Sequence, residues 1–220
     1  TIYNTLYSEF GPQGWWPVKN KYNKNNFKIP GTKKEQFEII LGAVLTQNTS
    51  WKNVEKALDK LRKNNLISPG KLLKTDNKKL AGFIRSAGYF NQKTVYLKNI
   101  SKFISENKDL EKIPVKKLRQ RLLSVKGIGP ETADSILLYA FKKPFFVVDL
   151  YTKRVFSRLG ICKKETKYLE LQDLFHQNVL NKTGLFNEYH ALIVELAKRH
   201  CKKNPVCTNC PLTHFCKKNL

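Results

Sequence analysis

The segment from residue 122 to residue 134 constrains the fold of this chain more than any other. Its sequence is LLSVKGIGPETAD, which predicts a helix, a tight turn containing Gly127 and Gly129, and a second helix. Glycine adopts a left-handed backbone at no steric cost, and Pro130 suits the first position of a helix. Backbone N–H groups at the start of a helix form a favourable site for a phosphate group. The segment therefore predicts two packed helices whose connecting turn binds an anion.

Helical periodicity extends over most of the chain. Apolar residues recur at three- and four-residue spacing, as in Ile193, Leu196 and Ala197, and proline or glycine separates the periodic segments. The apolar run at 145–148 has no partner strand in the sequence, so we expect an extended buried connector there. The expected fold class is all-α, with helices over residues 34–45, 54–62, 80–87, 92–105, 115–123, 131–141, 151–159, 169–180 and 188–200.

The charge balance favours a polyanionic partner. The chain has 220 residues, with 41 Lys and Arg against 17 Asp and Glu, a net charge of +24. A basic surface of this kind is typical of nucleic-acid binding, although a compositional bias toward Lys and Asn could also produce it. No apolar run approaches the roughly 20 residues that a membrane span needs, and no secretory signal is visible. We expect a cytoplasmic monomer associated with the nucleoid through DNA.

The cysteines predict a metal centre near the end of the chain. In secreted proteins, closely spaced cysteines usually form disulfides. Because no secretory signal is visible, ligation of a metal ion or an iron–sulfur cluster is the better interpretation here. Four thiolates can surround either an iron–sulfur cluster or a zinc ion. Five cysteines are present, and four of them lie close together with gaps of five, two and five residues: Cys201, Cys207, Cys210 and Cys216.

An isolated acid, Asp149, follows the apolar run at 145–148. In isolation this position favours an N-cap for the helix that begins near Tyr151. A catalytic role is compatible with that, because a helix N-terminus keeps a carboxylate ionised. An ionised carboxylate can stabilise the positive charge that develops on a sugar when its glycosidic bond breaks.

The two-glycine turn, the Val147-Val148-Asp149 sequence and the cysteine group together resemble the helix–hairpin–helix DNA glycosylases of the endonuclease III superfamily. Three further segments are similar to the 3-methyladenine DNA glycosylases of that superfamily: Trp15-Trp16-Pro17, the sequence LGAVLTQNT at 41–49, and GYFNQK at 88–93. The resemblance implies a helical barrel domain over 33–143 with the hairpin motif at about 116–141. It also implies a second lobe from 1–32 and 144–220, a cluster loop at 201–216, and Asp149 where the lobes meet.

The resemblance implies a monofunctional base-excision glycosylase that hydrolyses the N-glycosidic bond of a flipped alkylated purine, such as 3-methyladenine, in double-stranded DNA. Asp149 is the implied catalytic residue. Bifunctional members carry a lysine where this chain has Glu131, and a carboxylate cannot form a Schiff base, so AP lyase activity should be absent or weak. The four cysteines are the implied ligands of a [4Fe–4S] cluster, with zinc as the alternative; members of the superfamily usually have six residues in the first gap.

The resemblance also assigns binding residues. Aromatic side chains that stack on a flipped base and the acid beside them form the implied base pocket, although each also has a plain interpretation as a core or first-turn residue: Trp15, Trp16, Phe37 and Glu131. The implied DNA-binding residues have several roles. Those expected to fill the space left by the base are Gln47, Asn48, Tyr89 and Phe90. The hairpin residues expected to bind phosphate are Lys126, Gly127, Ile128 and Gly129, the lysines expected to meet phosphates beside the cluster are Lys202 and Lys203, and Lys93 is a further implied DNA-binding residue.

Two alternatives stay open. One keeps the fold and changes the chemistry, giving an endonuclease III-like glycosylase and AP lyase that acts on oxidised pyrimidines or on mismatched thymine or uracil. The other is a DNA-structure-binding module without catalytic activity.

Overall fold

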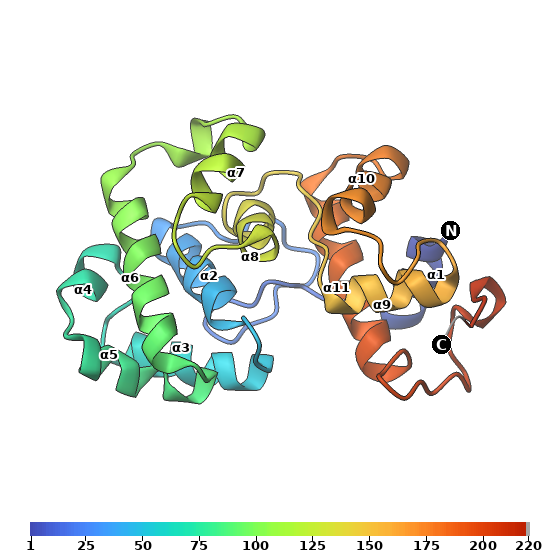
Figure 1. The fold of residues 1–220 in the computed structure, drawn as a ribbon, viewed down its shortest axis with the longest axis horizontal. Coiled ribbons are helices and arrows are strands. Elements are labelled where there is room, and N and C mark those ends of the chain that lie inside the picture. Colours follow the sequence, from blue (N-terminus) through green and yellow to red (C-terminus); the bar gives the residue numbers. More distant parts are fainter. Residues whose placement is uncertain (219–220) are drawn as a thin grey trace. The chain divides into compact units, whose positions relative to one another are not determined.

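The computed structural model describes residues 1–218, and helices form most of its regular structure (Figure 1). Among these residues no β-sheet forms, and extended pairing is limited to an isolated bridge between Val18 and Lys21. The expected all-α fold class is confirmed. No helix in this part of the chain is both long and apolar enough to cross a membrane. The chain divides into two compact units, of which unit 1 comprises 1–15, 22–27 and the chain from residue 144 onward, and unit 2 comprises 16–21 and 28–143.

Unit 2 is built around α2 (Lys33–Leu45). Thr32 caps this helix by accepting a hydrogen bond from the Glu35 backbone N at 3.2 Å. All nine residues from Phe37 to Leu45 are buried, and the helix contacts α3, α6, α8 and η3. A helix that buries its whole circumference must lie inside a domain. The other elements of unit 2 are α3 (Trp51–Lys63), α4 (Pro69–Lys74), α5 (Asn77–Phe83), η1 (Arg85–Ala87), α6 (Phe90–Glu106), η2 (Leu110–Lys112), α7 (Val115–Leu123), α8 (Pro130–Ser135) and the π-helical η3 (Ile136–Ala140).

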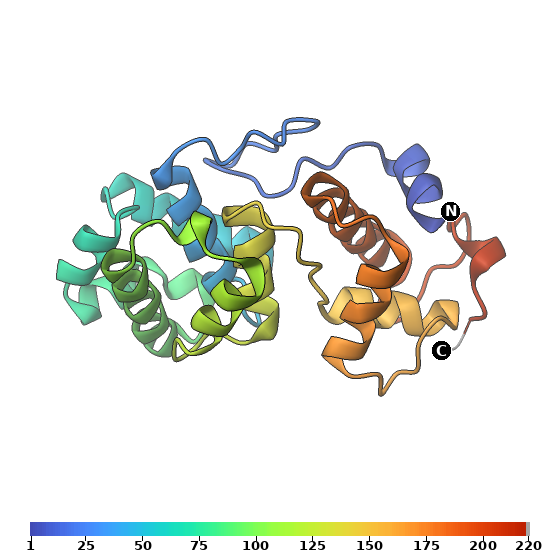
Figure 2. The same ribbon diagram turned by 90° about the horizontal axis from the view of Figure 1, so that it is seen from above.

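Unit 1 packs around Phe146 in the connector that leads to Asp149. Residues 145–148 are extended, as expected, and Phe146 is fully buried. Its ring stacks on Phe175 at a centroid distance of 3.6 Å, and Gln172 Nε2 donates to its carbonyl oxygen at 2.5 Å. Helix α11 contacts both α1 and α9 (Figures 1 and 2). The elements of unit 1 are α1 (Ile2–Phe10), α9 (Leu150–Leu159), α10 (Tyr168–Asn178), α11 (Thr183–Arg199) and η4 (Thr213–Phe215).

Each expected helical segment contains a helix, although α3, α5 and α11 begin three to five residues earlier than expected, the segment 80–87 is divided between α5 and η1, and α10 ends at Asn178. Two helices, α1 and α4, were not anticipated. The Ser68-Pro69-Gly70 sequence suggested a break, but Ser68 is the N-cap of α4 and proline occupies its first turn, where the missing N–H costs nothing. In α1 the apolar residues Ile2, Leu6 and Phe10 do recur at helical spacing, although only Leu6 is buried.

The N-terminal segment is shared between the two units. Residues 16–21 and 28–32 belong to unit 2, whereas the sequence suggested that all of 1–32 joined the other lobe. Trp16 explains the difference, because its ring packs edge-on against Trp51 at 5.3 Å. Gly42 on α2 makes room for it, since a Cβ atom there would lie 3.1 Å from the indole nitrogen of Trp16.

Candidate functional site

The hairpin between α7 and α8 forms as the sequence predicts. Gly127 has a φ of 99°, and a Cβ atom at this position would lie 2.2 Å from the ring of Tyr96. Both the backbone conformation and the close approach therefore require glycine. Ile128 is buried and anchors the turn, while Lys126 and Gly129 are exposed. The exposed main chain at the start of α8 can meet a phosphate group.

Gln47 connects the end of α2 to this hairpin. Its Nε2 donates to the Gly127 carbonyl at 2.9 Å and to Thr132 Oγ1 at 3.0 Å. The side chain that was expected to enter the space left by a flipped base is therefore hydrogen-bonded within unit 2. The next residue, Asn48, is exposed and has a left-handed backbone with a φ of 52°.

The turn before α6 presents a second exposed side chain. Tyr89 is 67% exposed and also has a left-handed backbone, with a φ of 45°. Phe90 is half-buried, and the guanidinium of Arg85 lies 5.8 Å from its ring centroid. Tyr89 is thus better placed than Phe90 to meet a DNA duplex.

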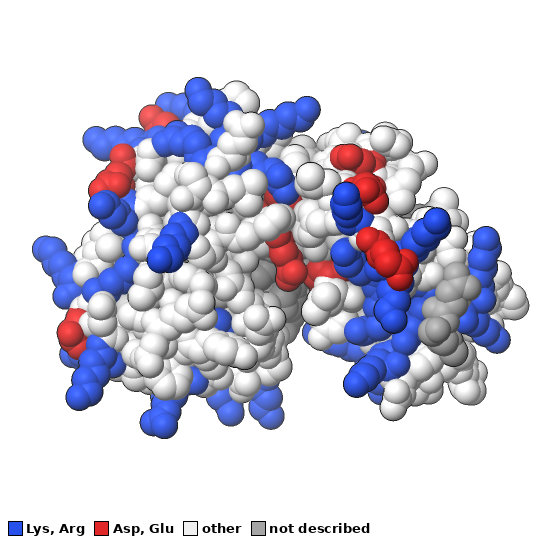
Figure 3. Space-filling model, in the orientation of Figure 1, with Lys and Arg blue, Asp and Glu red and all other residues white. Residues whose placement is uncertain are grey.

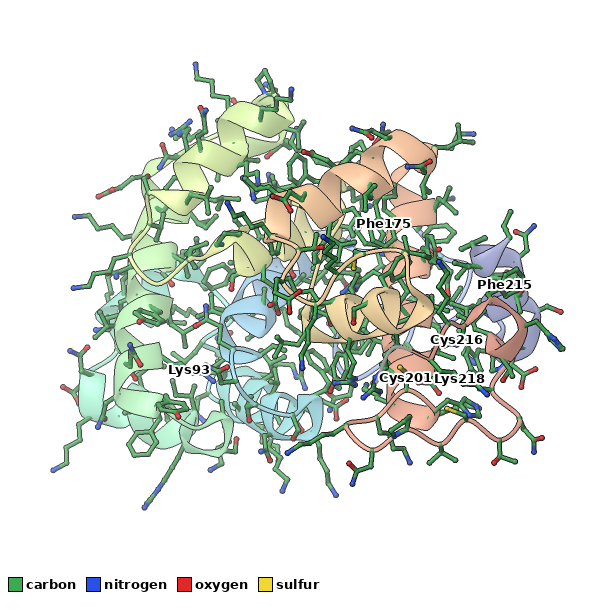
Figure 4. The ribbon with its side chains drawn as sticks, turned by 45° about the vertical axis from the view of Figure 1, so that its right-hand side comes forward. Lys93, Phe175, Cys201, Phe215, Cys216 and Lys218 are labelled. Atoms are coloured by element: carbon green, nitrogen blue, oxygen red, sulfur yellow. The ribbon has the colours of Figure 1, made fainter. Side chains whose placement is uncertain are left out.

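Lys93 does not occupy the position expected of a DNA-binding residue. Its side chain is buried, with 2% exposure, and its Nζ donates to the carbonyls of Leu45 at 2.9 Å, Gln47 at 2.7 Å and Ala87 at 2.7 Å. Figure 4 labels Lys93 on α6 in unit 2. Burial lowers the pKa of its ammonium to about 8. The structure therefore does not support a direct DNA contact by Lys93, because three backbone carbonyls hold its ammonium in the interior.

Asp149 caps helix α9, and its second carboxylate oxygen faces a histidine. Its Oδ1 accepts hydrogen bonds from Thr152 N at 2.7 Å and from Thr152 Oγ1 at 2.8 Å, while its Oδ2 lies 3.5 Å from His190 Nε2. The carboxylate side chain is 13% exposed. The capping interpretation is confirmed, since one oxygen caps the helix, and the catalytic role stays a prediction that this geometry permits.

The environment of Asp149 keeps it ionised. Burial by itself raises the pKa of this carboxyl, but the His190 imidazole and the two Thr152 hydrogen bonds outweigh it and hold the pKa below its ordinary value. Hydrogen bonds to the charged form stabilise that form. His190 lies on α11 and is buried. A single histidine on an apolar helix face carries no sequence signal that distinguishes it from a core residue, so sequence reasoning missed it.

The expected base-pocket residues have different environments. Trp15, in unit 1, is half-buried and lies 6.0 Å from Tyr22, with Lys198 Nζ 5.9 Å from its ring centroid. Trp16 and Phe37, in unit 2, are 7% and 2% exposed. For Phe37 the core interpretation holds. Its side chain lies on α2 and is buried in unit 2, so neither face of its ring is open to a base.

Glu131 lies in the first turn of α8, directly after the hairpin, and is exposed. A first-turn acid interacts favourably with the helix dipole. Helix α8, which follows the hairpin and spans Pro130–Ser135, contains no lysine. An amine is therefore missing from the position where the superfamily resemblance would require one for Schiff-base chemistry.

The cysteine-rich loop follows α11 and packs against α9. Arg158 Nη1 lies 3.4 Å from Cys201 Sγ, and Cys216 Sγ lies 3.4 Å from the Arg158 carbonyl oxygen; Figure 4 labels both cysteines. Burial raises the pKa of Cys210, and the three other thiols of the group raise it further. Within residues 1–218, no three His, Cys, Asp or Glu side chains are gathered closely enough to hold a metal ion.

Four cysteine thiols in one loop are a donor set that suits a cluster or zinc chemically, although in the described residues the sulfur atoms are not gathered around one point. Lys202 and Lys203 in the same loop are exposed. Figure 3 shows Lys and Arg side chains spread over the displayed face of both units, with fewer acidic ones. A surface of this kind attracts a polyanion.

The family to which this fold belongs follows from comparison with known proteins. The family model of the HhH-GPD superfamily base excision DNA repair proteins matches residues 41–179, and the chain belongs to this family. It is therefore a DNA glycosylase.

Individual relatives agree with this assignment. The chain is 44% identical over 221 residues to a protein of Methanocaldococcus jannaschii provisionally described as a DNA repair glycosylase, covering 98% of this chain and 94% of that one. It is 32% identical over 190 residues to endonuclease III of Sulfolobus acidocaldarius, covering 86% and 85% of the two chains. Among solved structures, the 3-methyladenine DNA glycosylase MagIII of H. pylori, bound to 1,N6-ethenoadenine, aligns with a TM-score of 0.72 and 31% identity over 90% of this chain and 96% of that one.

Proposed function

We propose that this protein is a monofunctional glycosylase that removes alkylated purines, such as 3-methyladenine, from double-stranded DNA. The observation that carries the proposal is the ionised, hydrogen-bonded carboxylate of Asp149. Cleavage of an N-glycosidic bond develops positive charge on the sugar, and a fixed anion stabilises that charge. The likeness to the H. pylori 3-methyladenine glycosylase supports an alkylated purine as the substrate.

In this mechanism Thr152 and His190 position the carboxylate. The two Thr152 hydrogen bonds hold Oδ1, so that Oδ2 is the oxygen turned toward His190 at 3.5 Å. The carboxylate stabilises the sugar cation and orients or deprotonates the attacking water. An alkylated purine carries a positive charge and leaves readily, so little help from a general acid is needed. Its cationic ring would also gain from stacking on the aromatic face of Trp15.

The proposed reaction ends at an abasic site. In the bifunctional enzymes that this chain resembles, strand cleavage requires an amine directly after the hairpin. In this chain Glu131 occupies that position. A carboxylate cannot form an imine with the opened sugar. Incubation with borohydride and damaged DNA should therefore trap no covalent adduct, whereas an endonuclease III-like lyase would be trapped.

We also propose that the loop cysteines, Cys201, Cys207, Cys210 and Cys216, hold a [4Fe–4S] cluster. When bound, the cluster would serve as a structural cross-link for the loop. It would order Lys202 and Lys203 for phosphate contacts, and bond cleavage would not depend on it. Chemical analysis distinguishes the two groups, because a [4Fe–4S] cluster contains equal amounts of iron and sulfide and a zinc site contains neither.

The decisive experiment incubates the purified protein with methylated duplex DNA and identifies the released bases. Release of 3-methyladenine, lost in Asp149→Asn, supports the proposal. Release of oxidised pyrimidines or of mismatched thymine or uracil instead would identify the endonuclease III-like alternative. DNA binding without release of any base would identify a binding module.

A further inference from the structure

Two turns of unit 2 present exposed side chains on left-handed backbone. Asn48 follows α2 with a φ of 52°, and Tyr89 precedes α6 with a φ of 45° and 67% exposure. Asparagine tolerates such a conformation, whereas it is unfavourable for tyrosine and persists at Tyr89 only where the surrounding structure holds it. The groups that hold these two turns therefore decide how the exposed side chains are presented.

Lys93 joins the two turns through one buried ammonium. Its Nζ donates at 2.7 Å to the carbonyl of Gln47, which immediately precedes Asn48, and at 2.7 Å to the carbonyl of Ala87, two residues before Tyr89. These two carbonyl oxygens therefore lie within twice that distance of each other. A third bond, at 2.9 Å, caps the end of α2 at Leu45. Because the bonds to Leu45 and Ala87 are buried, water cannot replace them if they are lost.

The connection continues to the phosphate-binding hairpin. The carbonyl of Gln47 binds Lys93, while its side-chain amide donates to Gly127 at 2.9 Å and to Thr132 at 3.0 Å. Direct hydrogen bonds thus run from Ala87 through Lys93 and Gln47 to the hairpin. Charge-assisted bonds such as those of the ammonium are the stronger members of such a chain.

We propose that Lys93 is a positioning residue that locks the turns bearing Asn48 and Tyr89 into one arrangement with the hairpin, so that gripping the DNA backbone is coupled to extrusion of the damaged base. This inference rests on the proposed glycosylase function. Extrusion of a paired base costs unpairing and unstacking free energy, and an unpaired base costs least. Side chains that fill the vacated space repay that cost only if they are held in place.

Lys93→Met tests the proposal, and Lys98→Met is its matched control. Methionine retains an unbranched apolar stem and removes the N–H donors. Lys98 lies on the same helix and also donates to two backbone carbonyls, those of Leu73 at 3.2 Å and Thr75 at 2.7 Å, at the end of α4. The control therefore removes the same kind of bond from α6 without touching either turn.

Single-turnover excision is measured on the same lesion paired with its normal partner and placed opposite an abasic site. We expect Lys93→Met to be slower by about tenfold or more on the paired lesion but within about threefold of wild type on the unpaired one. Lys98→Met should stay within about threefold on both substrates. Equal losses on the two substrates, or a wild-type rate on the paired lesion, would overturn the proposal, because a general loss of structure does not distinguish them.

A second readout separates this inference from the proposed function. The fluorescence of 2-aminopurine in the duplex rises when a base is extruded and requires no bond cleavage. Absence of excision by the wild-type protein would refute the glycosylase proposal, while the fluorescence rise and its reduction in Lys93→Met would still test the coupling. If the methionine variant does not fold, Lys93→Gln, which keeps two donors on a shorter stem, should show the same substrate-selective loss, and an equal loss would overturn the proposal.

Discussion

Replacing Asp149 with asparagine should remove catalysis while preserving the fold. The amide oxygen of asparagine can still accept the Thr152 backbone hydrogen bond, now 2.7 Å long, so helix α9 keeps its cap. The substitution removes only the negative charge that faces the reacting sugar. It therefore isolates the electrostatic contribution of the carboxylate from its structural one.

The magnitude follows from Coulomb's law. A carboxylate about 4 Å from a sugar cation contributes about 4 kcal/mol at an effective dielectric constant of about 20. Each 1.36 kcal/mol changes a rate about tenfold, so the excision rate should fall about 10³-fold. Single-turnover release of 3-methyladenine measures this fall, and the Kd for undamaged duplex should change little. A rate within about tenfold of wild type would refute the catalytic role of Asp149.

Asp149→Ala is the structural companion of this variant. Alanine cannot accept the Thr152 hydrogen bonds, and loss of an N-cap costs about 1 kcal/mol, or about 2–4 °C in Tm for a chain of this size. Asp149→Asn should show a smaller fall in Tm, because its amide oxygen can still accept a hydrogen bond from Thr152. A larger Tm loss for asparagine than for alanine would contradict the capping geometry.

The acid side of the stability profile gives a further check. The pKa of Asp149 lies below its ordinary value of 3.8 in the folded protein, so folding favours the ionised form. Its contribution is therefore present above the ordinary pKa and is lost as the pH falls through the folded-state value. Acid unfolding followed by circular dichroism should show this contribution in the wild type and not in Asp149→Asn.

Three further substitutions test the surrounding structure. Gly127→Ala places a Cβ atom 2.2 Å from the Tyr96 ring on left-handed backbone, so duplex DNA should bind more weakly whether damaged or not, and an unchanged Kd would argue against the hairpin as the phosphate site. Gly42→Ala brings a Cβ atom to 3.1 Å from the Trp16 indole, and overpacking of this kind should lower stability by about 1–3 kcal/mol, as urea unfolding would measure. Cys210→Ser should abolish the visible absorption of the cluster and its bound iron while single-turnover excision at low salt persists; retention of full iron content would exclude this cysteine as a ligand.

Local pattern was sufficient for much of this protein. The helices follow from three- and four-residue apolar spacing, and the hairpin follows from two glycines and a proline between two helices. Asp149 could be singled out because an isolated acid ends an apolar run, and its capping role follows from the helix after it. These features depend on residues that are neighbours in the chain, and their physics acts over one or two turns of backbone.

The tertiary structure decided the environments of the functional side chains. Nothing local distinguishes Lys93, which is buried under three carbonyls, from the exposed Lys126. Likewise, His190 meets Asp149 from a helix some forty residues away in the chain, and Gln47 bonds to a hairpin eighty residues away. Apolar periodicity records which face of a helix is buried, but it does not record which distant polar group that face will meet. Such pairings arise only when the helices pack, and they decide the burial, charge state and hydrogen bonding on which the proposed chemistry depends.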